Sequence, residues 1–302
     1  MNPNQSNSLT PAKTIPDLQK ALGEFRSGKP SGSLGLVPTM GALHAGHLSL
    51  VEESLRENDF TAVTIFVNPT QFNDPRDYEA YQINLERDLQ LLQEAGADLC
   101  FAPGAEEIYP AGDSEMLLSL PALEKNLCGP GRPGHFAGVL LIVARWLNLF
   151  RPERAYFGKK DYQQFLLIKR MAQELYFPAE IIGLPTLREE DGLAMSSRNA
   201  RLDEKSREHA ELIYRALKLG KKTFESRDCA PREVREIVSD VIESGSLNKV
   251  DYVDIVHPET LEKLEDFSGH ARVLIAVAVF CGPLPVRLID NVECEREFFR
   301  ND

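Results

Sequence analysis

The sequence predicts an α/β protein with a Rossmann-like parallel sheet, helices on both of its faces, and a smaller C-terminal α+β domain. The chain has 302 residues, 43% of them hydrophobic, which is ample for one large or two medium domains. Helical and strand-like patterns alternate along the first part of the chain, as they do in folds with a parallel sheet. After Thr186 this alternation stops. We therefore expect one domain over residues 1–185 and a smaller one over residues 186–302.

Five helical patterns occur in the first part. The stretch 15–28 begins with Pro and Asp and ends in glycine, which are start and stop signals for a helix. The stretch 46–58 has three apolar residues at helical spacing, and Gly96 closes the third stretch. The stretch 135–150 is mostly apolar, which indicates a buried helix. In chain order, the expected helices cover residues 15–28, 46–58, 85–96, 135–150 and 161–175.

Five strand-like stretches separate these helices. They are short and rich in β-branched, aromatic and other apolar residues. In chain order, the expected strands cover residues 34–39, 61–67, 98–103, 154–158 and 179–186.

The last third of the chain has helices first and strands afterwards. Helical patterns lie around residues 208–224 and 231–244, and three β-rich stretches follow at 250–256, 273–280 and 285–292. Strands that follow one another without intervening helices favour an α+β arrangement.

Composition excludes several classes of protein. The net charge is −12 and the sequence pI is about 5.1, which argues against nucleic acid as the main partner. The five cysteines include no Cys-x-x-Cys pair, so we expect buried thiols in a reducing compartment and neither disulfides nor a zinc site. The N-terminus has no apolar signal core, and the longest apolar run, 273–281, is far short of a membrane span. We expect a soluble, cytoplasmic protein.

The stretch "PTMGALHAGHLSL", residues 38–50, contains the first candidate site. His44 and His47 lie between an expected strand and an expected helix, where ligands bind in parallel α/β folds. Gly41 and Gly46 would let a ligand approach the backbone, and the N–H groups of a helix that opens near Gly46 would favour an anion such as phosphate. Two imidazoles could stabilise charge on a phosphorus centre. The alternative is a helix cap with two surface histidines.

A second candidate is "GLAMSSRN", residues 192–199. Ser196, Ser197 and Arg198 offer two hydroxyls and a cationic fork for a triphosphate. The alternative is a serine-rich helix entry. The His-x-Gly-His pattern after a strand, together with this loop, resembles the nucleotidyltransferase superfamily.

Five motifs occur together and in order: "PTMGALHAGH", "IFVNPTQF", "RPGHFAGV", "FGKKDYQQ" and "DGLAMSSRN". In this combination they resemble the pantothenate synthetase family, which joins pantoate to β-alanine using ATP. The resemblance is clear from about Leu34 to Ala200 and weaker towards the C-terminus.

The resemblance implies a role for each matching residue. His44, His47, Lys160 and Arg198 would be catalytic. The residues implied to bind ATP are Pro38, Thr39, Met40, Gly41, His44, Gly46, His47, Gly158, Lys160, Asp161, Leu187, Met195, Ser196, Ser197 and Arg198. The residues implied to bind pantoate or β-alanine are Gln71, Gln164, Asn68 and Arg132. Turn, helix-entry and surface-charge roles are the alternatives for these residues taken singly.

The chain departs from the family pattern at three positions. Ala45 and Lys159 stand where an acidic residue is usual. Asp88 matches a position implicated in metal binding, but its expected partner four residues on is Leu92. We therefore expect no protein-held metal, and Mg²⁺ would accompany ATP.

The resemblance also implies the reaction and the assembly. Pantoate and ATP would form pantoyl adenylate, and β-alanine would displace AMP. Because the mixed anhydride hydrolyses readily, we expect the Met195–Arg198 loop and the smaller domain to act as a lid over a nucleotide- and pantoate-binding domain. A homodimer is expected, with no nucleic-acid or membrane partner. The alternatives are an adenylyltransferase acting on a phosphate monoester, a fragment of a tRNA-charging enzyme, and a non-catalytic nucleotide-binding module.

Overall fold

The structure is a computed structural model that describes residues 9–73, 78–79, 81, 83–112, 115–226 and 229–296. The chain forms two compact units. Unit 1 comprises Met1–Ser119, Arg132–Lys159 and Leu167–Pro185, and unit 2 comprises Leu120–Gly131, Lys160–Leu166 and Thr186–Asp302. No sequence pattern indicated that the two short segments Leu120–Gly131 and Lys160–Leu166 belong with the C-terminal part.

A five-stranded parallel sheet forms the centre of unit 1, in the order β3-β2-β1-β4-β5. This confirms the predicted parallel sheet. Its strands are β1 (Leu34–Thr39), β2 (Phe60–Ile65), β3 (Leu99–Phe101), β4 (Arg154–Gly158) and β5 (Glu180–Leu184). The chain leaves β1 towards β2 and later returns to the other side of β1 with β4, so the sheet has a topological switch point between β1 and β4.

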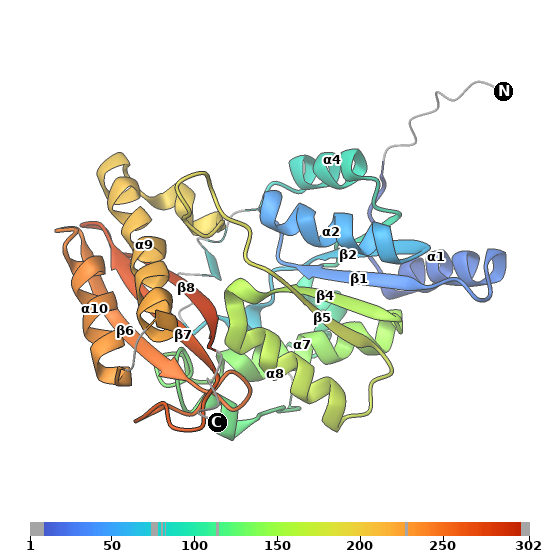
Figure 1. The fold of residues 1–302 in the computed structure, drawn as a ribbon. Coiled ribbons are helices and arrows are strands. Elements are labelled where there is room, and N and C mark those ends of the chain that lie inside the picture. The colour runs from blue at the N-terminus through green and yellow to red at the C-terminus, as the bar shows by residue number, and fades with distance from the viewer. Residues whose placement is uncertain are drawn as a thin grey trace. The chain divides into compact units, whose positions relative to one another are not determined.

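Helices cover both faces of this sheet, as predicted. In Figure 1, α2 and α4 lie on one face and α7 and α8 on the other. The longer helices are α1 (Ile15–Gly28), α2 (Ala45–Glu57), α4 (Leu85–Ala95), α7 (His135–Phe150) and α8 (Tyr162–Glu174). Each lies within two residues of its predicted bounds. The short helices α5 (Ala105–Ile108), α6 (Pro121–Glu124), η1 (Pro69–Gln71) and η2 (Lys159–Asp161) carried no periodic signal.

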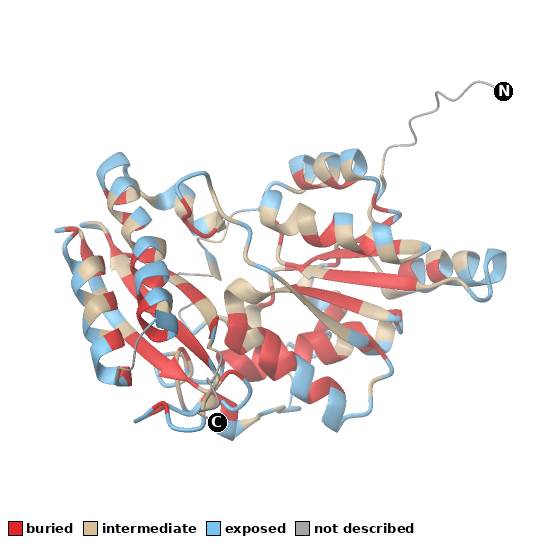
Figure 2. Cartoon of the chain, in the orientation of Figure 1, coloured by how far each residue is buried: buried red, intermediate tan, exposed pale blue. Residues whose placement is uncertain are grey.

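The core of unit 1 follows from the apolar strands. Val37 of β1, Val63 of β2 and Tyr156 of β4 pack with Val51 of α2 and Leu92 of α4 in one buried cluster. Strands β1, β2 and β3 and the middle of β4 are mostly buried, β5 is only partly buried, and the outer surfaces of the helices are exposed (Figure 2). This burial holds the carboxyl ends of the strands, and the loops that follow them, in fixed register.

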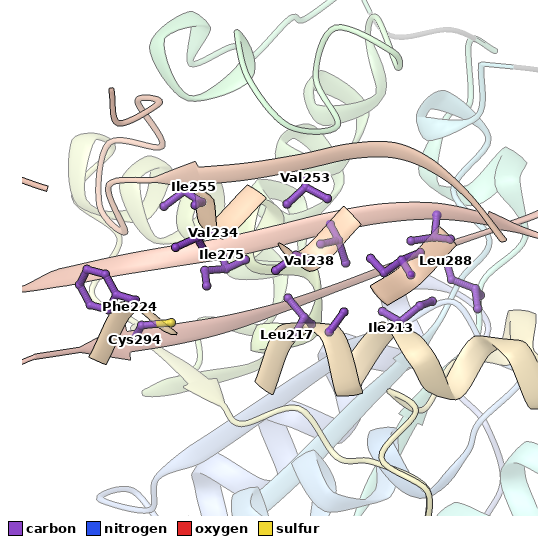
Figure 3. Packing of buried hydrophobic residues seen from close by; sticks show 14 of the residues in the cluster. Ile213, Leu217, Phe224, Val234, Val238, Val253, Ile255, Ile275, Leu288 and Cys294 are labelled. Carbon is purple, nitrogen blue, oxygen red and sulfur yellow. The ribbon is translucent and has the colours of Figure 1, made fainter. Parts of the chain in front are cut away.

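Unit 2 contains a three-stranded antiparallel sheet in the order β6-β7-β8 and two long helices. The elements are η3 (Ser197–Arg201), α9 (Glu204–Ser226), α10 (Pro231–Glu243), β6 (Asn248–Val256), β7 (Arg272–Cys281) and β8 (Val286–Glu295). Figure 3 shows Ile213 and Leu217 of α9 and Val234 and Val238 of α10 packed against Ile275 and Leu288 of the sheet. The predicted smaller α+β part is confirmed.

No helix among the described residues is both long enough and apolar enough to cross a membrane.

Candidate active site

The loop after β1 lies at the topological switch point. Pro38 and Thr39 are the last residues of the strand, and Met40 begins the loop. The Thr39 hydroxyl donates to the Thr64 carbonyl of the neighbouring strand at 2.6 Å and accepts the Gly41 amide at 3.2 Å. These bonds fix the start of the loop at the carboxyl ends of the strands, where ligands bind in this class of fold.

The two histidines cap the helix that follows. His44 is the N-cap of α2, and its Nδ1 accepts the Gly46 amide at 3.1 Å. His47 Nδ1 accepts the His44 amide at 3.4 Å, and the two rings lie 4.1 Å apart between centroids. Since Nδ1 accepts a backbone donor in each ring, each neutral imidazole carries its proton on Nε2.

The helix begins one residue earlier than expected, at Ala45. The Gly46 amide is bonded to His44, so it is not one of the N–H groups that an anion could take. The capping alternative thus describes the Nδ1 atoms correctly. It does not account for the Nε2–H donors, which are the chemically useful atoms of the pair.

Gln71 ends η1 close to this loop and is 8% exposed. Its Nε2 lies 2.9 Å from the Met40 sulfur, and its Oε1 accepts from Asn68 Nδ2 at 3.2 Å. Unit 1 therefore brings Gln71, predicted to bind pantoate, into contact with Met40, predicted to bind ATP.

Asn68 has no bonding capacity to spare. Its Nδ2 donates to Gln71 Oε1 and to the Gly138 carbonyl at 3.0 Å, and its Oδ1 accepts from Thr70 and Tyr109 hydroxyls at 3.0 and 2.7 Å. The side chain is 1% exposed. All four positions of the amide are used within unit 1, and one of them bonds the Gln71 side chain.

His135 was missed by sequence reasoning. It is 6% exposed, its Nδ1 lies 2.7 Å from the Gln71 carbonyl, and its Nε2 lies 2.8 Å from Arg132 Nη1. A guanidinium can only donate, so His135 accepts at Nε2 and donates from Nδ1 to Gln71. The signal that could have found it is a polar residue at the start of an otherwise apolar helix.

The nucleotide candidates that follow β4 begin with Gly158 at the end of that strand. In unit 2, Lys160 is held by Asn291, whose Nδ2 donates to the Lys160 carbonyl at 2.9 Å. The Lys160 ammonium is 3.7 Å from the Asp161 carboxylate, and the lysine side chain is only 18% exposed against 48% for the aspartate.

Two adjacent glutamines in unit 2 have different surroundings. Gln163 is buried and donates to the Leu123 and Asn126 carbonyls at 2.8 and 2.9 Å, while it accepts the Cys128 amide at 3.0 Å. Gln164 is partly exposed at the next position. Gln163 ties the segment Leu120–Gly131 into unit 2, which leaves Gln164 as the glutamine suited to a ligand.

The segment from Leu187 to Arg198 is a folded loop of unit 2. The Met195 amide donates to the Leu187 carbonyl at 3.0 Å, and Arg188 forms a bidentate pair with buried Asp290 at 2.6 and 3.0 Å. Burial raises the pKa of the Asp290 carboxyl, against the opposing effect of the guanidinium. Arg188 also stacks on Tyr214, with its guanidinium carbon 3.8 Å from the ring centroid.

Ser196 is the N-cap of η3, and its Oγ accepts the Arg198 amide at 3.2 Å. The helix-entry alternative is thus correct for this hydroxyl. Ser197 is partly exposed and Arg198 lies beside it at the start of η3, so both side chains can meet a ligand.

Among the described residues, no group of three His, Cys, Asp or Glu side chains could hold a metal ion. Asp88 is 1% exposed and accepts the Ala42 and Leu43 amides, both at 2.8 Å. Its carboxylate is therefore bonded to the backbone.

Comparison with known proteins places this geometry in context. Residues 11–293 match the family described as Pantoate-beta-alanine ligase. A pantothenate synthetase of Leptospira interrogans is 48% identical over 275 residues, covering 91% of this chain and 95% of the relative. The crystal structure of pantothenate synthetase from Thermus thermophilus has a TM-score of 0.84 at 44% identity and covers 94% of this chain and 99% of its own. A pantoate-beta-alanine ligase from Francisella tularensis, complexed with beta-gamma ATP and beta-alanine, has a TM-score of 0.76 at 35% identity, covering 94% and 97%.

Proposed function

The chain belongs to the pantoate–β-alanine ligase family, and from this membership we propose that it joins pantoate to β-alanine using ATP, with AMP and pyrophosphate as the other products. The observation that carries the proposal is the loop after β1. There, two histidines have their Nε2–H tautomer set by backbone donors, and Gln71 lies against Met40 of the same loop. A phosphate-facing pair of donors beside a neutral amide suits a reaction between a nucleotide and a hydroxy acid.

The first step makes an acyl adenylate. A carboxylate oxygen of pantoate attacks the α-phosphorus of ATP, the bond to the bridging oxygen breaks, and pyrophosphate leaves. His44 and His47 donate from Nε2 to the phosphate oxygens on which negative charge develops. Preorganised donors of this kind act without reorganisation at the moment of reaction, and removing one commonly costs about 100- to 1,000-fold in rate.

The second step makes the amide. The β-alanine nitrogen attacks the acyl carbon, the bond from that carbon to the AMP oxygen breaks, and the nitrogen loses a proton. A mixed anhydride hydrolyses readily, so water must be excluded between the two steps. We assign this exclusion to residues 186–302 as a lid domain, and nucleotide and pantoate binding to residues 1–185.

Binding roles follow the chemistry of each group. ATP is bound by the histidine loop, Gly158, Lys160, Asp161, the Leu187 backbone and the Met195–Arg198 segment. Lys160 and Arg198 supply positive charge to the triphosphate, and Ser196 and Ser197 supply hydroxyls. Gln71 and Gln164 hydrogen-bond pantoate, whose hydroxyls need neutral partners. Asn68 acts on the acid substrates through Gln71, to which it donates, and Arg132 acts through His135, which bonds the Gln71 carbonyl.

Mg²⁺ enters as a companion of the ATP phosphates, whose charge it neutralises. The protein is proposed to work as a cytoplasmic homodimer. Likeness to the family supports both the Mg²⁺ requirement and the homodimer.

One assay tests the proposal. Enzyme with ATP, Mg²⁺ and pantoate, without β-alanine, should exchange labelled pyrophosphate into ATP, and adding β-alanine should give AMP and pantothenate. Absence of exchange with normal overall synthesis would contradict the adenylate intermediate. Activity on a phosphate monoester in place of pantoate would indicate an adenylyltransferase, and ATP binding without pyrophosphate release would indicate a non-catalytic module.

A further inference from the structure

The turn between β1 and α2 has left-handed backbone at two successive residues. Gly41 has φ +81° and Ala42 has φ +51°. Glycine adopts this conformation without cost, but alanine does so only where its surroundings hold it there. A Cβ at Gly41 would lie 2.8 Å from Ile83 Cγ2 and 3.0 Å from Asp88 Oδ2, so the turn is pressed closely against the start of α4.

Asp88 is the group that holds this turn. It lies in the first turn of α4, where the helix dipole favours negative charge, and it is 1% exposed. Its Oδ2 accepts the amide of left-handed Ala42 and its Oδ1 accepts the amide of Leu43, each at 2.8 Å. One carboxylate therefore satisfies two successive backbone donors of an otherwise strained segment.

The residues on either side of these two amides belong to the histidine loop. Leu43 is 3% exposed in the core cluster of unit 1, and His44, the N-cap of α2, follows it directly. Met40, which contacts Gln71, precedes the turn by one residue. A shift of the turn would move both the His44 imidazole and the Met40–Gln71 contact.

We propose that Asp88 is a positioning residue for the ligation: by holding the Ala42 and Leu43 amides, it sets where His44 and Met40 lie, and it is not a metal ligand. The inference rests on the proposed function, because it assumes that His44 stabilises charge in adenylate formation. A carboxylate is required because an amide side chain has a single acceptor oxygen and would turn an N–H donor towards one of the two backbone donors.

The first test compares Asp88→Asn with Glu86→Gln, an exposed acid in the same first helical turn. We expect D88N to lower kcat of pantoate-dependent pyrophosphate exchange at least about tenfold, with smaller changes in the KM values, because the lost alignment acts in the transition state. E86Q removes the same charge from the same end of α4 and should stay within about twofold. Equal effects of the two variants would overturn the proposal.

A second variant separates positioning from a general loss of stability. Ala42→Gly in the D88N background removes the strain that the carboxylate opposes. The kcat of the double variant should therefore be at least about threefold higher than that of D88N. No recovery would mean that Asp88 does not act through the turn. The Mg²⁺ concentration for half-maximal exchange should be the same in D88N and wild type, and a tenfold rise would make Asp88 a metal ligand.

Amide hydrogen exchange on the wild-type protein needs no variant. The Ala42 and Leu43 amides should exchange at least about a hundred times more slowly than unstructured amides, although both lie in a loop. Exchange at the unstructured rate would overturn the anchoring even if D88N failed to fold. If the wild type showed no pantoate-dependent pyrophosphate exchange, the proposed function would fail, while amide protection would still decide whether Asp88 anchors the turn.

Discussion

His44 and His47 form a reciprocal cap: His44 Nδ1 accepts from the first turn of α2, and His47 Nδ1 accepts the backbone amide of His44 at 3.4 Å. The Nδ1 of each ring thus stabilises the helix. The Nε2 of each ring carries the proton that we propose is donated in a hydrogen bond to a phosphate oxygen. A substitution at either histidine therefore has two separable consequences, one for stability and one for chemistry.

Asparagine at position 44 separates these consequences. Asparagine is a good N-cap, whereas alanine is a poor one that costs about 1 kcal/mol of stability. We expect His44→Asn and His44→Ala to slow pyrophosphate exchange equally, by roughly a hundredfold or more. Thermal unfolding should place H44N closer to the wild type than H44A. His47→Ala should slow exchange to a similar degree.

His257 provides the control. Its Nδ1 also accepts two backbone amides, those of Glu259 and Thr260, at 3.2 and 3.3 Å. His257→Ala removes the same kind of cap far along the sequence and should leave exchange unchanged. Near-normal exchange in both H44A and H47A would assign the histidine pair to capping alone.

Three glutamines, Gln71 of η1 and the adjacent Gln163 and Gln164 of α8, should respond differently to substitution. Gln71→Ala and Gln164→Ala should raise the KM for pantoate more than that for ATP, because each removes hydrogen bonds to pantoate of about 1 kcal/mol. Gln163→Ala removes three internal hydrogen bonds and should instead lower the unfolding temperature. Steady-state kinetics for both substrates check the first outcome, and calorimetry checks the second. Equal changes in both KM values for Q71A and Q164A would mean that these glutamines do not read pantoate.

The two lysines of η2 can be separated in the same way. Lys160, whose side chain is 18% exposed, should contribute about 1.5–3 kcal/mol to the binding free energy of a partly desolvated triphosphate. Lys160→Ala should therefore lower kcat/KM for ATP at least about tenfold. Lys159→Glu, a change towards the acidic residue usual in the family, should alter it less than about fivefold. The kcat/KM for ATP must be measured for both variants at the same ionic strength. A larger effect of K159E would transfer the nucleotide contact to Lys159.

Three buried thiols should be inert. Burial raises the pKa of Cys100 and of Cys294 to about 12 and that of Cys281 to about 11. A raised pKa lowers the thiolate fraction, so at pH 8 these three thiols are almost entirely protonated, and only the thiolate is nucleophilic. Iodoacetamide should label partly exposed Cys229 first in the folded protein. Mass spectrometry of the labelled peptides checks this, and rapid labelling of Cys281 would contradict it.

Periodicity was sufficient for the main elements of the fold. The apolar run of β1 and the helical spacing in α2 predicted both elements to within a residue, because burial on a sheet and on a helix imposes different periods. The start of α2 was misplaced by one residue, since sequence rules for N-caps favour Ser, Thr, Asp and Asn, and here a histidine has that role.

The site was predicted less completely than the fold. Motifs predicted Gln71 and Lys160 as ligand-binding residues, and those roles remain predictions. The buried partners that hold the site, His135 and Asn291, were missed because their contacts lie 64 and 131 positions away in the chain. Local patterns cannot reveal which distant backbone group will accept a given donor.

Unit 2 is built from segments that lie far apart in the chain, and this has a consequence during synthesis. Asn126 donates to the Leu261 carbonyl, its partner 135 positions later, and Gln163 holds the same early segment. At roughly 5–20 residues per second, a ribosome makes that partner about 7 to 27 s after Asn126. By the end of this interval every strand of the parallel sheet has been made, but Leu120–Gly131 has until then lacked the C-terminal part of its unit. Unit 2 can therefore be completed only after its C-terminal part has been made, and a chain that terminates early leaves Leu120–Gly131 without the residues it packs with.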